Sequence, residues 1–226
     1  MYKNNFVSAI ITAAGSGKRM GASLPKLEIK IKDKALIDYT VEKFFSLQIF
    51  DEIILLTSQG LLDTYRERFK KYENLKVVLG GASREESTYL GLKDLSLISD
   101  LVVCHDGARP FVAKKTILDS LDSALAYGSG IAAVKAKDTI KLADNNKVIK
   151  DLDRSKLYQI QTPQTFKSQL IKNAYDQGFG KIKATDDSSF LENIGKDVYL
   201  VEGTYENIKI TTKEDLVFGK MLMEVL

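Results

Sequence analysis

Short apolar runs rich in β-branched residues alternate with longer amphipathic stretches along the chain. Six runs have the length of a strand and are bounded by Gly, Asp or Asn, as buried parallel strands usually are. They are Val7–Thr12, Glu52–Thr57, Leu75–Leu79, Leu101–His105, Ile131–Ala136 and Val198–Val201. Apolar residues recur at helical spacing in four other stretches, which are Ala35–Leu47, Arg84–Leu97, Ala113–Tyr127 and Thr212–Leu226. This alternation predicts an α/β fold with a doubly wound, mostly parallel sheet and helices on both faces.

One segment breaks the alternation. Thr139–Ile149 contains two short polar strands around Asp144-Asn145-Asn146, which predicts a β-hairpin. A narrow hairpin is marginally stable by itself, so we expect it to lean on the rest of its own domain or on a second subunit.

The composition is that of an ordinary globular protein, with 44% hydrophobic and 28% charged residues. A length of 226 residues suits one domain, so we expect a single domain over residues 1–226. The net charge of +3 is too small to imply nucleic acid, and one cysteine excludes both a disulfide framework and a zinc cluster built on cysteine. The longest uncharged stretch, Asn4–Gly17, is too short and polar to span a bilayer, and it is a poor secretory signal. We therefore expect a cytoplasmic enzyme without a membrane partner.

The first chemical signal is the loop Gly15–Gly21, which follows the first predicted strand. Backbone N–H groups of a Gly-rich turn suit phosphate oxygens. The loop is neither a dinucleotide fingerprint, because Met20 stands at the last glycine position, nor a Walker loop, because Arg19 follows Lys18. Together with Lys26, these residues place three cations beside a phosphate-ready turn. The alternative is a surface turn with solvated lysines.

The second signal is the end of the fourth predicted strand, Cys104–Pro110. In open α/β sheets ligands bind beyond the carboxyl ends of strands, which puts Asp106 and Arg109 on the same rim as the glycine loop. An acid there can hold Mg²⁺ or orient a hydroxyl, and an arginine can fork onto a phosphate. Adjacent strand residues point to opposite faces, so we expect Cys104 to be a small core residue and His105 to be structural rather than its catalytic partner.

A third signal lies between a predicted strand and helix. Gly81 allows close backbone approach to a flat ligand, and Ser87 is placed to reach the same ligand. The alternative is an ordinary strand–helix turn with Ser83 as the N-cap.

In the C-terminal half, Lys209 lies in an Ile-Lys-Ile-Thr pattern that predicts a strand. A lysine among such apolar neighbours needs an anionic partner or ligand. Thr185–Asp187 fits a cap and acidic first turn for a helix over Ser188–Asn193.

In combination, these segments resemble a known family. The run Ala13–Met20 with Pro25-Lys26 resembles the signature loop of sugar- and polyol-phosphate nucleotidyltransferases. Further motifs narrow the resemblance to the polyol-phosphate cytidylyltransferases, and among them to the 2-C-methyl-D-erythritol 4-phosphate cytidylyltransferase family. They are His105–Pro110, Asp138–Lys141, Gln161–Gln164 and Glu206–Thr211, and the match covers nearly the whole chain in order.

The resemblance implies a Rossmann-like fold and an enzyme of non-mevalonate isoprenoid biosynthesis. Its substrates would be CTP and 2-C-methyl-D-erythritol 4-phosphate, with pyrophosphate released. The implied CTP contacts are Ala13, Ala14, Gly15, Gly17, Gly81 and Ser87. The implied catalytic cations are Arg19, Lys26 and Lys209. The implied contacts to the polyol phosphate are Asp106, Arg109, Thr139, Arg154 and Thr162. Relatives often carry an acid where this chain has Ala82, so a side-chain contact to the base is not expected there.

The resemblance also implies Mg²⁺, held largely by the CTP phosphates with Asp106 as a candidate ligand. It implies a homodimer in which residues 138–156 protrude as a dimerisation arm and place Thr139 and Arg154 in the neighbouring subunit's site. Three alternatives stay open: a ribitol 5-phosphate cytidylyltransferase, a non-catalytic nucleotide-binding module on the same fold and, disfavoured by the failed fingerprint, a nicotinamide-dependent dehydrogenase.

Overall fold

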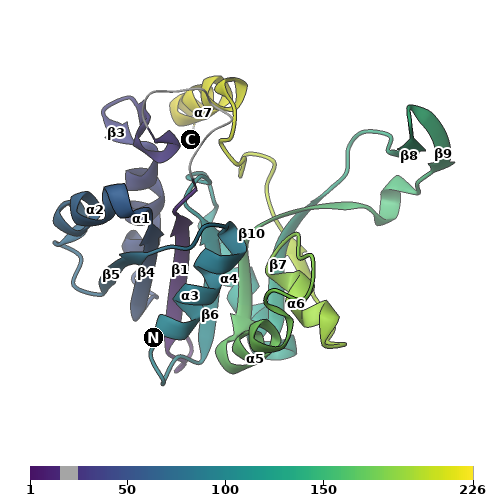
Figure 1. The fold of residues 1–226 in the computed structure, drawn as a ribbon. Coiled ribbons are helices and arrows are strands. Elements are labelled where there is room, and N and C mark those ends of the chain that lie inside the picture. The colour runs from purple at the N-terminus through teal and green to yellow at the C-terminus, as the bar shows by residue number, and fades with distance from the viewer. Residues whose placement is uncertain (16–24, 226) are drawn as a thin grey trace.

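A seven-stranded sheet with the order β11-β7-β10-β6-β1-β4-β5 forms the centre of the molecule (Figure 1). The computed structural model describes residues 1–15 and 25–225. The strands are β1 (Val7–Ala13), β4 (Glu52–Thr57), β5 (Leu75–Leu79), β6 (Leu101–Asp106), β7 (Ser129–Lys135), β10 (Tyr158–Lys167) and β11 (Leu200–Glu202). β10 pairs antiparallel with β6 and β7, and the other pairs are parallel. The prediction of a mostly parallel α/β sheet is confirmed.

The order of the strands reverses direction between β1 and β6. From β1 the chain adds β4 and then β5 on one side, and then crosses to place β6 on the other side of β1. Such a reversal leaves a crevice at the carboxyl ends of the two central strands, where α/β proteins bind their ligands. The fold therefore places the loops after β1 and β6 next to each other.

Helices cover both faces of the sheet. α1 (Leu36–Ser46), α2 (Leu62–Phe69) and α4 (Lys114–Tyr127) contribute to one apolar cluster, and α3 (Arg84–Asp94), α5 (Ser168–Gly178) and α6 (Ser188–Asn193) to the other. Along β1, Ala9 and Ile11 belong to the first cluster and Ile10 to the second, because successive strand residues face opposite sides. The last helix, α7 (Lys213–Val225), packs partly buried leucines against the first cluster. Among the described residues, no helix combines the length and apolar character needed to cross a bilayer.

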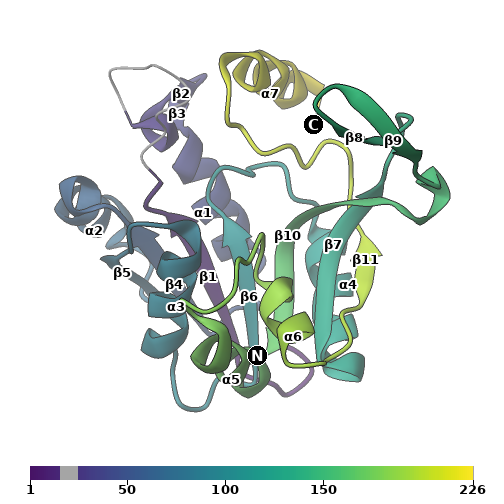
Figure 2. The same cartoon turned by 45° about the vertical axis from the view of Figure 1, so that its right-hand side comes forward.

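A hairpin arm leaves the body between β7 and β10 (Figures 1 and 2). Its strands, β8 (Lys141–Asp144) and β9 (Lys147–Asp151), pair with each other and form their own two-stranded sheet. Asn145 and Asn146 have φ values of 46° and 65°, as a two-residue hairpin turn requires. Every residue of both strands is exposed, so the predicted hairpin is confirmed and makes no packed layer with its own body.

The elements not predicted from the sequence include α2, α5, the central strand β10 and a small separate sheet of β2 (Lys30–Ile31) and β3 (Lys34–Ala35). β10 contains Pro163 and several polar residues, and its pairing with β7 shifts register between Ile160 and Gln164. A proline-containing polar run has none of the signs of a central strand. The prediction of a strand around Lys209 is wrong, because residues 207–211 form a connection without regular secondary structure. Within it, the Ile210 N–H donates to the Ala108 carbonyl at 2.9 Å.

Candidate active site

A cleft of about 320 Å³ lies at the carboxyl ends of β1 and β6. Its walls come from the loops after β1, β5 and β6, the short 3-10 helix Lys26–Glu28 and the segment before α7. The lining residues are Thr12–Gly15, Lys26, Leu27, Gly81–Arg84, Ser87, Asp106, Ala108, Lys209 and Thr211. The size is that of a small-molecule site, and the position is where the strand order reverses.

The structure brings most of the predicted site residues into this one cleft. They are Ala13, Ala14, Gly15, Lys26, Gly81, Ser87, Asp106 and Lys209. Gly17 and Arg19 lie outside the described residues. Arg109 and Thr162 contact Asp106 from positions that do not line the cleft.

Two predicted residues, Thr139 and Arg154, lie at the arm and not in the cleft of their own chain. The Arg154 Nη1 atom donates to the Lys137 carbonyl at 2.7 Å. Their expected role in a neighbouring subunit stays a prediction.

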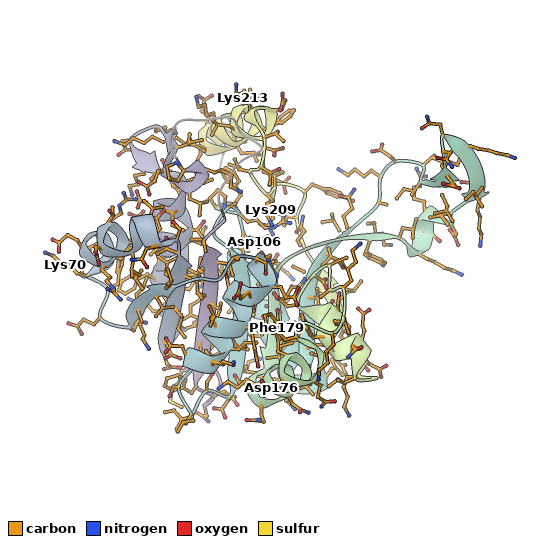
Figure 3. All side chains as sticks on the ribbon, in the orientation of Figure 1. Lys70, Asp106, Asp176, Phe179, Lys209 and Lys213 are labelled. Carbon is orange, nitrogen blue, oxygen red and sulfur yellow. The ribbon has the colours of Figure 1, made fainter. Side chains whose placement is uncertain are left out.

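Asp106 is the centre of the site. It ends β6 with 5% of its surface exposed. Its Oδ1 atom accepts a hydrogen bond from Arg84 Nε at 2.8 Å, and its Oδ2 atom lies 2.9 Å from Lys209 Nζ and 3.4 Å from Arg109 Nε. Figure 3 shows Asp106 and Lys209 next to each other above the sheet. Burial acts to raise the pKa of Asp106, but the three cations together hold it well below its usual range, so the group is ionised.

Arg84 joins three elements, a role that was not predicted from the sequence. At the start of α3, its Nη1 and Nη2 atoms donate to the two carboxylate oxygens of Asp187, each at 2.8 Å, while Nε reaches Asp106. Asp187 is fully buried and also accepts from the Tyr175 hydroxyl at 2.6 Å. Burial acts to lower the pKa of Arg84, but the two carboxylates raise it well above its usual value. The sequence does contain one indication of this pairing. A cation in the first turn of a helix opposes the helix dipole, so Arg84 is expected to have an anionic partner.

Lys209 is held in place by a backbone anchor. The Nη1 atom of Arg109 donates to the Asn207 carbonyl at 2.7 Å, and the Asn207 side chain donates to the Thr162 carbonyl at 2.8 Å. These bonds fix the segment two residues before Lys209 and bring its amino group to Asp106. The expectation that Lys209 needs an anionic partner is confirmed, although the segment is not a strand.

The loops after β1 and β5 touch at the floor of the cleft. A Cβ atom at Gly80 would lie 2.5 Å from the Ala14 Cβ atom, so glycine is needed there for the two loops to meet. The Ser87 hydroxyl accepts from the Gly81 N–H at 3.1 Å, and the Ser83 hydroxyl accepts from Glu86 N–H at 2.9 Å. Ser83 is thus the N-cap of α3, as the alternative interpretation of this turn expected, and Ser87 fixes the backbone of Gly81.

Cys104 and His105 do not form a catalytic pair. Cys104 packs into the second apolar cluster, whereas the His105 ring lies 4.9 Å from the Phe44 ring of the first. The Nε2 atom of His105 hydrogen-bonds the Arg109 carbonyl and Nδ1 the Thr162 hydroxyl, both at 3.0 Å. Burial lowers the pKa of His105 to about 4, so the ring is neutral at physiological pH. The histidine supports the site's backbone, as the sequence indicated.

The described residues do not build a magnesium site of their own. They contain no group of three or more His, Cys, Asp or Glu side chains placed to share a metal ion. Both oxygens of Asp106 already face cations within 3.4 Å, and a further cation there is repelled. The arrangement does not fit Asp106 as a metal ligand, and Mg²⁺ held through nucleotide phosphates stays a prediction.

This small-molecule cleft lies at the strand reversal and is lined by Gly15 and by the cations Lys26, Arg84 and Lys209, and the described residues around it form no acid–base pair. Such an arrangement is that of a nucleotidyltransferase. The family model described as 2-C-methyl-D-erythritol 4-phosphate cytidylyltransferase matches residues 7–225, and the chain belongs to this family.

Similar proteins cover almost the whole chain. A 2-C-methyl-D-erythritol 4-phosphate cytidylyltransferase from Clostridium botulinum (strain Langeland) is 41% identical over 224 residues, which are 97% of this chain and 98% of the relative. The protein of that name from Clostridioides difficile (strain 630) is 40% identical over 96% of this chain and 94% of its own. The crystal structure of 4-diphosphocytidyl-2C-methyl-D-erythritol synthase from Anaerococcus prevotii is similar with a TM-score of 0.88 and 37% identity, covering 97% of this chain and 96% of that one. The Francisella tularensis cytidylyltransferase follows with a TM-score of 0.82 and 30% identity, covering 96% and 99%.

We expect the His105 imidazole to stay neutral until the pH approaches about 4, because burial disfavours its charged form. His105 is the one histidine in the sequence, so its Cε1–H resonance in a ¹H–¹³C spectrum is unambiguous. The same chain unfolded in urea is the control, and its imidazole titrates near 6.5. The unfolded state thus binds a proton that the folded state does not, and stability falls as the pH drops from 6.5 towards 4. A folded-state midpoint near 6.5 contradicts the buried, neutral ring.

Proposed function

We propose that this chain transfers the cytidylyl group of CTP to the phosphate of 2-C-methyl-D-erythritol 4-phosphate and releases pyrophosphate. The observation that carries the proposal is the ionised Asp106 carboxylate ringed by three cations in a phosphate-ready cleft. Family membership over nearly the full chain supports it, because the relatives' names state this activity.

The chemistry follows from charge. An oxygen of the acceptor phosphate attacks the α-phosphorus of CTP, and the bond from that phosphorus to the β-phosphate oxygen breaks. Attacker and target are both anions, so the barrier is lowered by cations fixed before the reaction, here Lys26 and Lys209. Arg19, which lies outside the described residues, is the third catalytic cation that the family resemblance implies. A phosphate monoester, with a second pKa of about 6, is already deprotonated at neutral pH and needs no strong base. A chain whose histidine is buried and neutral fits this reaction.

Asp106 has a separate task. Arg84, Arg109 and Lys209 face Asp106 and Asp187, so three positive and two negative groups leave the cluster with one positive charge. The surplus favours an anionic ligand, while the carboxylate accepts hydrogen bonds from acceptor hydroxyls and orients the acceptor. Arg109 and Thr162 serve this role through Asp106 rather than by lining the cleft.

We propose that Mg²⁺ enters with the triphosphate rather than on a protein-built site. Bound to the nucleotide, the ion supplies charge neutralisation on the leaving pyrophosphate. The residues of this chain orient the two substrates around it.

We propose that the arm joins two copies of the chain into a homodimer with shared sites. The arm exposes Leu142, Val148 and Ile149, and a two-stranded hairpin with such a surface is not stable by itself in water. Thr139 and Arg154 belong to the arm and do not line the cleft of their own chain. Because the arm projects from the body (Figure 1), a second copy would receive them.

The direct test is pyrophosphate release with CTP and Mg²⁺ against three conditions: 2-C-methyl-D-erythritol 4-phosphate, ribitol 5-phosphate and no acceptor. We expect release that depends on the acceptor, with at least about tenfold higher kcat/KM for methylerythritol phosphate, the size of discrimination that pocket shape provides. A preference for ribitol phosphate contradicts the substrate, and CTP binding without release contradicts catalysis. NAD in a thermal-shift control is expected to have no effect.

The shared site is tested by mixing two inactive variants. Arg154→Ala removes the arm's cation and Lys26→Ala removes a cleft cation, so each alone loses activity. After subunit exchange, mixed dimers rebuild one intact site, and an equal mixture regains up to about a quarter of the native sites. Each variant mixed with itself is the control. No rescue, with exchange shown by pull-down of differently tagged copies, contradicts a site shared across the dimer.

A further inference from the structure

The short 3-10 helix Lys26–Glu28 separates two clefts. Lys26 lines the active-site cleft, Leu27 is buried in the core with 5% exposed, and Glu28 lines a second cleft of about 360 Å³ beside α1 and α2. Successive residues of a 3-10 helix point about 120° apart, so the three side chains leave this turn in three directions. The orientation of the turn about its axis therefore decides where Lys26 points.

An ion pair in the second cleft fixes that orientation. The Nη1 atom of Arg68, on α2, donates to Glu28 Oε1 at 2.9 Å, and Nη2 donates to Oε2 at 2.7 Å. Such a two-bond fork defines the angle as well as the distance between its partners. The side chains are 29% and 17% exposed, and the guanidinium also lies 5.2 Å from the Tyr65 ring. Burial acts to raise the pKa of Glu28, but Arg68 outweighs this and lowers it, so the pair is charged.

The backbone transmits this constraint to Lys26. Glu28 N–H donates to the Pro25 carbonyl at 2.8 Å, and Ile29 N–H donates to the Lys26 carbonyl at 3.3 Å. Because these bonds hold the turn as one unit, a rotation of Glu28 is a rotation of Lys26.

We propose that the Arg68–Glu28 ion pair is a positioning device for Lys26, holding the turn so that the lysine amino group reaches the nucleotide phosphates. The inference rests on the proposed function, which assigns Lys26 to those phosphates. A lysine carries its charge on a flexible four-carbon stem, so a fixed backbone origin limits the positions the charge explores. A misplacement of about 1 Å costs up to about a hundredfold in rate.

Two conservative variants test the pair. Glu28→Gln keeps the size and removes the charge, and Arg68→Lys keeps the charge and removes the fork. Each is expected to lower kcat about tenfold while the KM for CTP changes less than about threefold, because Lys26 acts most strongly in the transition state. The matched control is Glu42→Gln, which breaks the 2.6 Å Lys34–Glu42 pair in the same second cleft without touching the turn. Its activity is expected to stay within about twofold of the unaltered protein. Thermal unfolding of every variant checks that the fold is intact.

A double-mutant cycle decides whether Glu28 acts through Lys26. Lys26→Ala alone is expected to lower kcat by about 10²–10³, the size typical of one lost transition-state contact. In that background Glu28→Gln is expected to cost less than about twofold, because the group it positions is gone. An equal loss in both backgrounds overturns the positioning role and leaves Lys26 in place. A Glu28→Gln protein of native activity also overturns it, and a Lys26→Ala protein within a few-fold of native activity overturns both the inference and the assignment of Lys26.

Discussion

The site depends on the ion pairs that the buried carboxylate of Asp106 makes with three cations. The carboxylate meets Arg84 on one oxygen and Lys209 and Arg109 on the other, so one side chain ties the end of β6 to the start of α3 and to the segment before α7. A charge with so little exposed surface is strongly unfavourable unless its partners compensate it, and removing one partner leaves the others uncompensated. Asp187 compensates Arg84 in the same way. It is fully buried and accepts hydrogen bonds from the guanidinium atoms of Arg84 that do not face Asp106. Charge pairs thereby hold the loops of the cleft together, beside the apolar contacts that Leu27 and Ala108 make with the first cluster.

This architecture suits a reaction between two anions. The cluster keeps one positive charge in surplus, fixed before any ligand arrives, and a preorganised charge stabilises a transition state without reorganisation. The group that most resembles a general base, His105, is buried, neutral and engaged by the Arg109 carbonyl and Thr162. Lys26 lines the same cleft and is positioned, as we propose, from the second cleft. The Asp106 ion pairs thus line the cleft itself, whereas the Arg68–Glu28 pair acts from outside it.

Much of the fold could be predicted because buried parallel strands are short apolar runs, and β4 and β5 begin and end where the sequence indicated. β10 could not be predicted, because its buried Gln161 and Gln164 are polar residues whose hydrogen-bond partners lie far away in the sequence. The Arg84–Asp187 pair joins residues 103 positions apart, and each has an ordinary local explanation in its own helix turn. For Lys209 the sequence predicted the anionic partner but not the backbone conformation. The neighbouring backbone groups of Asn207 and Ile210 hydrogen-bond to Arg109 and Ala108 instead of to a strand. Local periodicity thus predicts elements, whereas the charge network depends on contacts that only the folded chain creates.

The most direct measurement is the free energy of unfolding of Asp106→Asn, obtained by urea denaturation at pH 7 beside the unaltered protein. Asparagine keeps the shape and some hydrogen bonds but leaves Arg84, Arg109 and Lys209 without the shared negative charge. If that charge holds the site together, the free energy of unfolding falls by about 3 kcal/mol or more, as for other buried ion pairs that lose a partner. A change below about 0.5 kcal/mol, the size of an ordinary surface substitution, would contradict the central place given to this carboxylate.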